Sequence, residues 1–360
     1  MAGQKLNSNF WKDKKVFVTG HTGFKGSWLC IFLKLLGAKV TGYALKPKTN
    51  PSLFKLAKIE EILKKSIYAD IRNCKKLTKE IKQSKADIIF HLAAQPLVRH
   101  SYLYPQKTFD TNISGTLNIL ESIRKIKKIR SAIIITSDKV YDTSNNKIYK
   151  ETDKLGGVDP YSASKVCCEY LFSSYINSFF KGRSKQRLAT VRAGNVIGGG
   201  DYSEDRLIPD IYKSAKKTKK IILRNPNSVR PWQHVLEPLN GYLILAEKLY
   251  NNHKKLRNLQ QSWNFGPNLS NCKSVKYIAN FFSKHLKIKI KVEMTKSKIF
   301  KPETNFLRLN NYKSKKFINW YPRWSLEKSL RAILNWHYLA EIRNPRNICE
   351  NQIKEFLKKN

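Results

Sequence analysis

Short runs of apolar and β-branched residues alternate with longer amphipathic segments from residue 15 onward. Six of the short runs predict β-strands, and they read KVFVTG, KVTGYAL, SIYAD, DIIFHLAA, SAIIITS and RLATVRAG. The longer segments predict helices in GFKGSWLCIFLKLLG and around residues 53–64, 74–84, 107–126 and 160–180. Strands that alternate with helices in this way form a parallel sheet that is covered on both faces. We therefore predict an α/β protein with a doubly wound, Rossmann-like sheet.

The regular alternation weakens beyond about residue 194, where proline and tryptophan become more frequent. Loops in this part, such as GGGDYSEDRLIPD and RNPNSVRPWQHV, are typical of ligand sites. Because no repeat or low-complexity linker interrupts the chain, we expect its parts to pack closely around a ligand crevice. We assign residues 1–193, completed by part of 232–266, to the doubly wound domain, residues 194–345 mainly to a smaller mixed substrate-binding domain, and residues 346–360 to a tail.

The composition is that of a folded protein, with 41% hydrophobic residues in a chain of 360. No apolar run approaches the roughly 20 residues needed to cross a bilayer, and the beginning MAGQKLNSNFWKDKK lacks the apolar stretch of a signal peptide. We expect a cytoplasmic protein with no membrane partner. The six cysteines include no C-x-x-C pair, and we interpret them as reduced thiols with no role in a metal site or a disulfide.

The net charge of +43, from 69 Lys+Arg against 26 Asp+Glu, raises nucleic-acid binding as an alternative function. The lysines are spread over nearly every predicted surface helix, without the basic stripe and aromatic platform of a dedicated binder. We therefore predict no dedicated nucleic-acid site. Nonspecific affinity for polyanions and attraction of an anionic substrate both stay open.

A glycine-rich loop follows the first predicted strand and leads directly into a helix. Its candidate cofactor-binding residues are Gly20, His21, Thr22, Gly23, Phe24, Lys25 and Gly26. The first glycine allows a tight turn, the second lets the backbone approach a pyrophosphate, and the third permits close packing of helix on strand. The amino terminus of the helix favours phosphate charge. The loop therefore predicts a dinucleotide site, and the alternative is an ordinary glycine-containing turn.

The ends of the second and third strands leave NAD and NADP both open. The second strand ends without the carboxylate that would bind the adenosine ribose of NAD, and Lys46 there is either a partner for a 2′-phosphate or a solvated loop lysine. Asp70 and Ile71 follow the third strand as candidate cofactor contacts. We expect the Asp70 carboxylate to accept a hydrogen bond from the adenine amine, with a cap or turn as its alternative role.

Tyr161 and Lys165 are four residues apart in a predicted helix, so their side chains share one face. A neighbouring ammonium favours the phenolate form of a tyrosine, which can then remove a proton from a sugar hydroxyl while a hydride leaves the same carbon. The spacing alone is common, and two surface residues of a helix would also produce it.

The order of the motifs resembles the extended short-chain dehydrogenase/reductase family. The glycine loop comes first, then Leu92-Ala93-Ala94 after the fourth strand, Thr136-Ser137-Asp138-Lys139 after the fifth, and finally Tyr161 and Lys165. This resemblance implies a nicotinamide cofactor bound by Leu92, Ala93, Ala94, Tyr161 and Lys165 in addition to the glycine loop. It also implies that Ser137 orients the substrate hydroxyl beside Tyr161.

Asp138 and Lys139 distinguish between the branches of this family. A sugar-nucleotide 4,6-dehydratase oxidises C4, removes the C5 proton, expels the C6 hydroxyl and returns the hydride to C6, so it needs an acid and a base beyond Tyr161. Dehydratases of the dTDP type have Asp-Glu at these positions, whereas Asp-Lys resembles the dehydratases that act on CDP-glucose. We assign Asp138 as the C6 acid and Lys139 as the C5 base, which requires a lysine pKa lowered by burial or nearby cations.

Longer strings carry the resemblance from about residue 10 to 340. They include GHTGFKGSWL, HLAAQPLVRHSY, ITSDKVYD, DPYSASK, VRAGNVIGGGD and RPWQHVLEPLNGYL. The resemblance implies a substrate site that contains Gln95, Arg99, Asn195, Arg206 and Arg230. Arginine suits this role because its planar guanidinium group can bind two phosphate oxygens. Alternatively, any of these arginines could form an ion pair with a carboxylate of the protein. For Trp232, core packing and substrate contact are equally open.

The resemblance further implies a redox-neutral enzyme that binds NAD, converts CDP-glucose to its 4-dehydro-6-deoxy derivative, and assembles as a homodimer or a higher homo-oligomer. The helices around 107–126 and 160–180 would form the dimer interface. A nucleotide-sugar epimerase or decarboxylase on the same fold is the main alternative, since it would use Tyr161 without Asp138 and Lys139.

Overall fold

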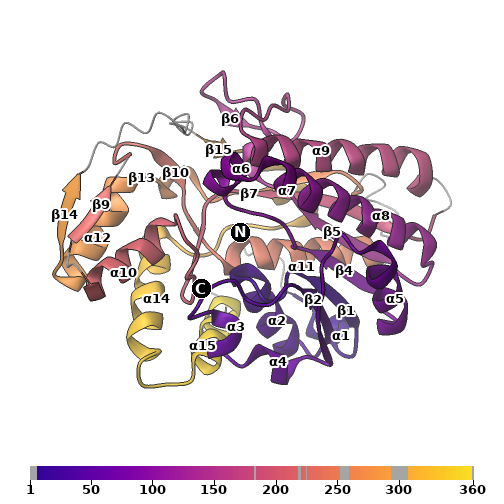
Figure 1. Cartoon of the computed structure of the whole chain (residues 1–360), viewed down its shortest axis with the longest axis horizontal. Coiled ribbons are helices and arrows are strands. Elements are labelled where there is room, and N and C mark those ends of the chain that lie inside the picture. Colours follow the sequence, from indigo (N-terminus) through magenta and orange to yellow (C-terminus); the bar gives the residue numbers. More distant parts are fainter. Residues whose placement is uncertain are drawn as a thin grey trace.

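A seven-stranded sheet forms the centre of the computed structural model, which describes residues 6–181, 184–217, 220–223, 225–251, 259–292 and 307–358 (Figure 1). All neighbouring strands run parallel, in the order β12-β7-β5-β4-β1-β2-β3. They are β1 (Lys15–Thr19), β2 (Lys39–Ala44), β3 (Lys65–Tyr68), β4 (Ile88–His91), β5 (Ser131–Ile135), β7 (Arg187–Ala193) and β12 (Ser262–Phe265). The strand order reverses between β1 and β4, the position where doubly wound sheets bind ligands. The predicted fold class is confirmed.

Helices cover both faces of the sheet, which explains why its strands are apolar throughout. Val16 and Val18 of β1 pack on the side of α2 (Phe24–Leu35) and α11 (Leu236–Asn251). Phe17, between them, packs on the opposite side, which is covered by α5 (Cys74–Ser84), α8 (Gly115–Lys125) and α9 (Pro160–Tyr175) (Figure 1). The side-chain alternation of a strand therefore sends successive apolar residues into two separate cores.

Three predicted helices are interrupted. Residues 53–64 form two short helices, α3 (Leu53–Leu56) and α4 (Ile59–Ile62), because Lys58 adopts the left-handed conformation with φ of 47°. Residues 107–126 comprise α7 (Pro105–Phe109), the π-helical turn η1 (Asp110–Ser114) and α8. The helix predicted around residues 160–180 comprises α9 and the π-helical turn η3 (Ile176–Phe180) that follows it. Hydrophobic periodicity predicted the apolar face of each helix but not these changes in backbone winding.

The part beyond residue 194 surrounds a third core that includes Trp232. Its elements are β8 (Val196–Ile197), α10 (Leu207–Lys217), β9 (Lys220–Leu223), β10 (Val229–Pro231), β11 (Gln233–His234), η5 (Leu269–Asn271), β13 (Cys272–Ser274), α12 (Val275–Leu286), β14 (Lys289–Val292) and α14 (Leu326–Leu339). They pair as short two-stranded sheets, β8 with β11, β9 with β14 and β10 with β13. Strand β12 and helix α11 return from this part to the large sheet.

The segment assigned to a tail forms a packed helix, α15 (Pro345–Leu357), where it is described. Ile348, Cys349, Ile353 and Phe356 are buried in the same core as α2, and α15 lies against that helix. The tail assignment is therefore corrected for residues 346–357, because an apolar face every three to four residues docks this helix on the sheet domain. The smaller remaining elements are α1 (Ser8–Trp11), α6 (Val98–Leu103), η2 (Asp138–Val140), β6 (Ile148–Tyr149), β15 (Arg308–Leu309) and α13 (Tyr312–Ile318).

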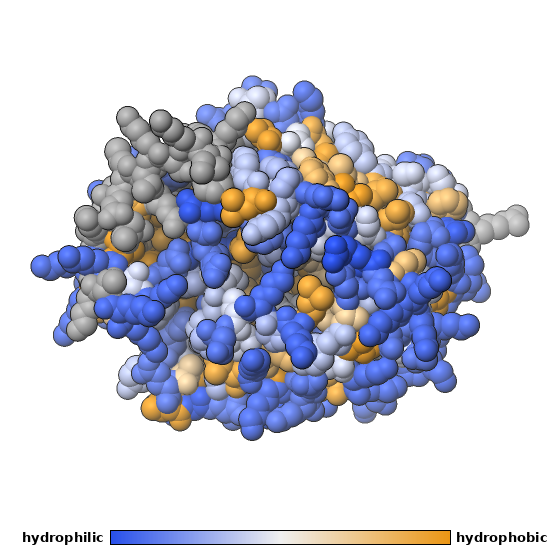
Figure 2. Space-filling model, in the orientation of Figure 1, coloured by the Kyte–Doolittle hydropathy of each residue, from blue (hydrophilic) through white to orange (hydrophobic). Residues whose placement is uncertain are grey.

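Within the described ranges, no helix is both long enough and apolar enough to span a membrane. Hydrophilic residues cover most of the face seen in Figure 2, and apolar residues appear there as smaller patches.

Candidate active site

The glycine loop is closely packed between β1 and α2. Gly20 has a φ of 75°, and a β-carbon there would lie 2.7 Å from the amide nitrogen of Ala93. A β-carbon at Gly26 would overlap the carbonyl oxygen of Gly20, so the first turn of α2 can approach the loop only without a side chain. Gly23, the residue before α2, adds no side-chain cap. The geometry fits a dinucleotide pyrophosphate, which would meet backbone amides at this helix terminus.

The other loop residues have different surroundings. The His21 ring is buried against Gly42, where a β-carbon would overlap it, and its Nε2 lies 2.8 Å from Ser66 Oγ. Burial lowers the pKa of His21 to about 4. The side chain therefore supports the loop from within the sheet domain, which leaves the backbone of His21 to contact a cofactor if one binds there. Thr22 donates a 2.8 Å hydrogen bond to the carbonyl of Leu45, which ties the loop to the end of β2.

Lys25 extends from the loop toward the centre of the site. Burial, together with the charges of Arg206 and Lys165, lowers its pKa to about 8, while the charge of Asp138 opposes this shift. Phe24, its neighbour, packs at the edge of the main core and comes close to Gly198. The loop therefore contributes a cation to the site in addition to its backbone amides.

The residues expected around the adenosine are at the ends of β2 and β3. The Asp70 carboxylate accepts hydrogen bonds from the Arg72 side chain, at 2.7 Å for the shortest, and from its backbone amide at 2.8 Å. These bonds lower the pKa of Asp70. Ile71 is buried against Gly115 and belongs to a core, whereas Lys46 is exposed.

The segment after β4 lies beside the glycine loop. The amide of Leu92 donates to the carbonyl of Thr19 at 3.2 Å, and the amide of Ala93 donates to the Thr19 hydroxyl at 3.2 Å. Ala94 is half-buried, as are Leu92 and Ala93. The structure thus brings the residues 92–94 together with Gly20, as the order of the motifs predicts.

Tyr161 and Lys165 point inward from the first turns of α9. Asp159 caps this helix by accepting the Ser162 amide at 2.9 Å, and the Tyr161 amide donates to Ser101 Oγ at 3.1 Å. The ammonium of Lys165 donates to the carbonyl of Ile135, the last residue of β5, at 3.2 Å. Burial lowers the pKa of Lys165.

The phenol of Tyr161 differs from expectation. Burial raises its pKa to about 12, although a hydrogen bond with Ser137 and the charge of Arg206 act in the opposite direction. We expected a lowered pKa from Lys165. The difference arises because transfer of a phenolate out of water costs more free energy than its attraction to the surrounding cations recovers.

Ser137 caps the short helical turn η2, which carries Asp138 and Lys139. Its hydroxyl accepts the Lys139 amide at 3.2 Å and donates to Asp138 Oδ1 at 3.2 Å. Asp138 Oδ2 is buried and has no hydrogen-bond partner among the described residues, and a β-carbon at Gly194 would lie 3.2 Å from it. Burial raises the pKa of Asp138 against the charges of Lys139, Arg230 and Lys25. A carboxyl in this state can hold a proton and donate it.

The expected phosphate ligands are distributed around this centre. Arg206 affects Tyr161 and Lys25 electrostatically, and Arg230, which is 7% exposed, affects Asp138. Asn195 is half-buried, and its carbonyl accepts the Gln233 amide at 3.1 Å. Arg99 forms a 3.2 Å ion pair with Asp205, which links α6 to the loop before α10.

Two substrate candidates are parts of the scaffold. The Gln95 side chain is buried, donates to Leu97 O and Thr108 Oγ1 at 3.0 Å each, and accepts the Leu97 amide at 2.7 Å. We therefore revise its expected role from substrate contact to support of the loop after β4. Trp232 is 3% exposed and donates to the Lys273 carbonyl at 2.8 Å, so core packing is its role.

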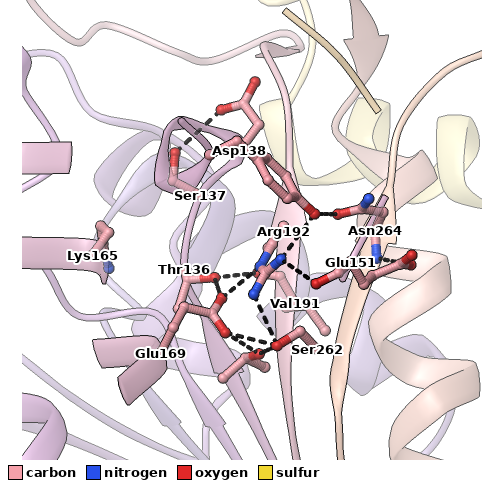
Figure 3. A network of polar contacts seen from close by, with 12 residues as sticks. Thr136, Ser137, Asp138, Glu151, Lys165, Glu169, Val191, Arg192, Ser262 and Asn264 are labelled. Carbon is pink, nitrogen blue, oxygen red and sulfur yellow. Dashed lines mark hydrogen bonds and ion pairs between the residues drawn. The ribbon is translucent and has the colours of Figure 1, made fainter. Parts of the chain in front are cut away.

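Sequence analysis missed a buried ion pair behind the site, between Glu169 of α9 and Arg192 of β7 (Figure 3). The Arg192 Nε and Glu169 Oε1 atoms are 2.9 Å apart. Glu169 also binds Thr136 and Arg192 binds Tyr141, the two residues that flank the segment 137–140. Two signals in the chain could have revealed it. Glu169 is four residues beyond Lys165 on the same helix face, and Arg192 is a charged residue near the end of a predicted strand that is mostly apolar.

Comparisons with known proteins agree with this geometry. A family model described as GDP-mannose 4,6 dehydratase matches residues 17–333. The CDP-glucose 4,6-dehydratase of Salmonella typhimurium is 44% identical over 337 residues, which cover 92% of each chain. The UDP-glucose 4-epimerase of Mycoplasma genitalium is 27% identical over 68% of this chain and 74% of its own.

Solved structures share the fold. The dTDP-glucose 4,6-dehydratase of Bacillus anthracis in complex with NAD has a TM-score of 0.74 at 21% identity, covering 90% of this chain and 96% of that one. The corresponding enzyme DesIV of Streptomyces venezuelae, with NAD and TYD bound, has a TM-score of 0.75 at 18% identity over 90% and 96% of the two chains. The match of the family model over residues 17–333 and the 44% identity to the Salmonella enzyme together show that this chain belongs to the GDP-mannose 4,6 dehydratase family.

Proposed function

We propose that this protein is an NAD-dependent lyase that converts CDP-D-glucose to CDP-4-dehydro-6-deoxy-D-glucose and water. One observation carries the reaction type: the buried Asp138 carboxyl, with a raised pKa and an unpartnered Oδ2, lies in the same centre as Tyr161 and Ser137. An epimerase or a simple reductase has no step that needs this additional acid. The name and the 44% identity of the Salmonella relative support CDP-glucose as the substrate.

The cofactor site would consist of the backbone from Gly20 to Gly26, the segment 92–94, and the Tyr161 and Lys165 side chains. NAD, when bound there, supplies the group that accepts a hydride from C4 and returns it to C6. Asp70 would accept a hydrogen bond from the adenine amine. Its carboxylate oxygens have lone pairs that the hydrogen bonds from Arg72 do not use. Lys165 would hold the nicotinamide ribose, since its ammonium has only one carbonyl partner among the hydrogen bonds to described residues.

Tyr161 begins the reaction by removing the proton of the C4 hydroxyl, with Ser137 holding that hydroxyl by a hydrogen bond. Its pKa of about 12 in the ligand-free chain is too high for an efficient base near neutral pH. We infer that a positively charged nicotinamide beside the phenol favours the phenolate once the site is filled. Lys25 and Arg206 add positive charge to the same region.

The elimination of water needs two proton transfers, one to a base and one from an acid. Lys139 would be the base and Asp138 the acid. The C4 ketone makes the C5 proton acidic, and the Lys139 amine takes this proton. As the C6–O bond breaks, Asp138 donates its proton to the departing hydroxyl, which leaves as water. Lys139 would then return a proton to C5 as the hydride adds at C6, and Asp138 and Tyr161 would regain their starting protonation states by exchange with solvent. Arg206, Arg230 and Asn195 would bind the substrate pyrophosphate, with Arg99 available from the opposite edge of the site.

We also propose a homodimer formed through α8 and α9. Helix α9 and its continuation η3 each expose an aromatic residue, Tyr170 at 61% and Phe179 at 49%. Aromatic residues are enriched in interfaces between protein chains, and most oligomers are symmetric pairs of this kind.

The test is to incubate the purified protein with CDP-glucose and NAD and to identify the product. We expect a 4-keto-6-deoxy sugar nucleotide, formed without net consumption of NAD. A C4 epimer would identify an epimerase, and stoichiometric reduction of the cofactor would identify a dehydrogenase. Repeating the reaction with NADP determines the cofactor preference, which the absence of a carboxylate at the end of β2 leaves open.

A further inference from the structure

The buried Glu169–Arg192 ion pair contacts the residues at both ends of the segment 137–140, which carries the proposed acid and base. On one side, the Thr136 hydroxyl lies 2.6 Å from Glu169 Oε1. On the other side, Arg192 Nη1 donates to the Tyr141 hydroxyl at 2.9 Å. In the sequence, residues 137–140, with the proposed acid and base, lie between these two anchors. Figure 3 shows Thr136, Ser137 and Asp138 beside the ion pair. A single pair of charges therefore fixes the start and the end of one short segment.

The pair itself is rigidly held. Glu169 and Arg192 are 2% and 3% exposed, and the remaining carboxylate oxygen accepts Thr190 Oγ1 and Ser262 Oγ at 2.8 Å each. Arg192 Nη2 donates to the same Ser262 hydroxyl at 3.0 Å. Burial opposes ionisation of Glu169, but the Arg192 charge and these hydrogen bonds lower its pKa below the usual value. The network thus joins β5, β7, β12 and α9 behind the reacting atoms.

The Tyr141 anchor extends further. Its hydroxyl donates to Asn264 Oδ1 at 2.7 Å, and its ring stacks on Tyr149 with centroids 5.1 Å apart. By contrast, Tyr161 and Lys165 have anchors of their own, through Ser101 and the carbonyl of Ile135. Loss of the Tyr141 hydroxyl should therefore loosen the acid and the base more than the oxidising pair.

We propose that Glu169 and Arg192 are positioning residues that act as a clamp. Through Thr136 and Tyr141, this clamp holds the segment that carries Asp138 and Lys139. Water elimination then depends on the clamp more strongly than C4 oxidation does. The proposal rests on the proposed function, because it assigns the elimination step to Asp138 and Lys139. A displacement of this segment by a fraction of an ångström would separate the acid from the C6 oxygen. C4 oxidation should slow less, because Ser137 moves with the segment whereas Tyr161 and Lys165 are held on α9.

Tyr141→Phe tests the clamp, and Tyr149→Phe is the matched control. The control removes a phenol hydroxyl from the neighbouring stacked ring, whose partner is the Asn145 carbonyl and not the ion pair. In single turnovers of Tyr141→Phe, we expect C4 oxidation, followed at 340 nm, within about threefold of wild type and elimination slowed by about ten- to hundredfold. Tyr149→Phe should change neither rate. Equal slowing of both steps in Tyr141→Phe, or no slowing, would overturn the proposal.

Thr136→Val removes the other anchor, and Thr136→Ser, which keeps the hydroxyl, should rescue it. Hydrogen exchange in the cofactor-free protein gives a readout independent of turnover. We expect faster exchange of the Lys139 amide, which bonds to Ser137 Oγ, in Thr136→Val and Tyr141→Phe but not in Thr136→Ser or Tyr149→Phe. Unchanged exchange in both anchor variants contradicts the clamp. If wild type forms no dehydrated product, the proposed function is wrong, and the exchange data still decide whether the clamp exists.

Discussion

Asp138 combines two properties at the scale of a single residue: burial raises its pKa, and one carboxyl oxygen has no hydrogen-bond partner in the part of the chain that the structure describes. As the proposed acid, it works only while protonated, so elimination should slow as the pH rises through this raised pKa. Asp138→Asn should remove that basic limb and slow turnover by about 10²- to 10⁴-fold. The pH dependence of kcat measures the limb, and Asp142→Asn, which changes a half-buried carboxyl paired with Lys154 near the same segment, should keep it. A basic limb that persists in Asp138→Asn belongs to another group.

Lys139 should show a separable defect. We expect Lys139→Ala to bind substrate and to oxidise C4 through Tyr161, and then to stop before water leaves. Reduced cofactor should then accumulate in a single-turnover absorbance trace near 340 nm, while deuterium from solvent no longer enters C5. Tyr161→Phe should abolish both signals because hydride transfer never begins. Dehydration by Lys139→Ala at a rate near wild type would exclude Lys139 as the base.

At the scale of elements, Glu237 joins α11 to the chain before α14. Its carboxylate accepts the amides of Arg323 and Trp324 at distances down to 2.7 Å. Burial nevertheless raises its pKa to about 7. Because the folded-state pKa exceeds the unfolded one, this group stabilises the fold below about pH 4.5 and the contribution is lost as the pH rises through 7.

Glu237→Gln keeps an acceptor for both amides but cannot ionise. The free energy of unfolding of wild type relative to this variant should therefore fall by on the order of 3 kcal/mol between pH 4.5 and 8. Denaturant titrations at several pH values measure the difference. Glu327→Gln, on the exposed side of α14, serves as the control and should run parallel to wild type. A pH-independent difference for Glu237→Gln would mean that the carboxyl is not buried as the structure has it.

At the scale of the whole molecule, the proposed homodimer would form through α8 and α9. We expect light scattering at micromolar concentration to give twice the mass of one chain. Tyr170→Glu should convert the dimer to a monomer, because pairing would bury two carboxylates without partners. Tyr338→Glu makes the same change at a 70% exposed tyrosine on α14 and should leave the dimer intact. A monomeric wild type, or a dimer that withstands Tyr170→Glu, contradicts this interface.

The sequence by itself determined the sheet and the order of its chemical motifs. Alternating apolar runs predict strands because they report burial on both faces, and six of the seven sheet strands follow from them. The glycine loop is also local in part: a β-carbon at Gly26 would overlap Gly20 in the same loop, and Gly20 has a positive φ of 75°. Tyr161 and Lys165 share a helix face by spacing alone.

Only the tertiary structure decided which polar residues face the reaction and which support it. Gln95 and Glu169 each occur in motifs beside site residues, yet burial and partners distant in the chain make one a loop support and the other half of an ion pair. The raised pKa values of Asp138 and Tyr161 likewise depend on loss of solvent, which no local pattern records. Spacing along the chain fixes which side chains share an element, whereas desolvation and charge depend on what packs against that element from elsewhere.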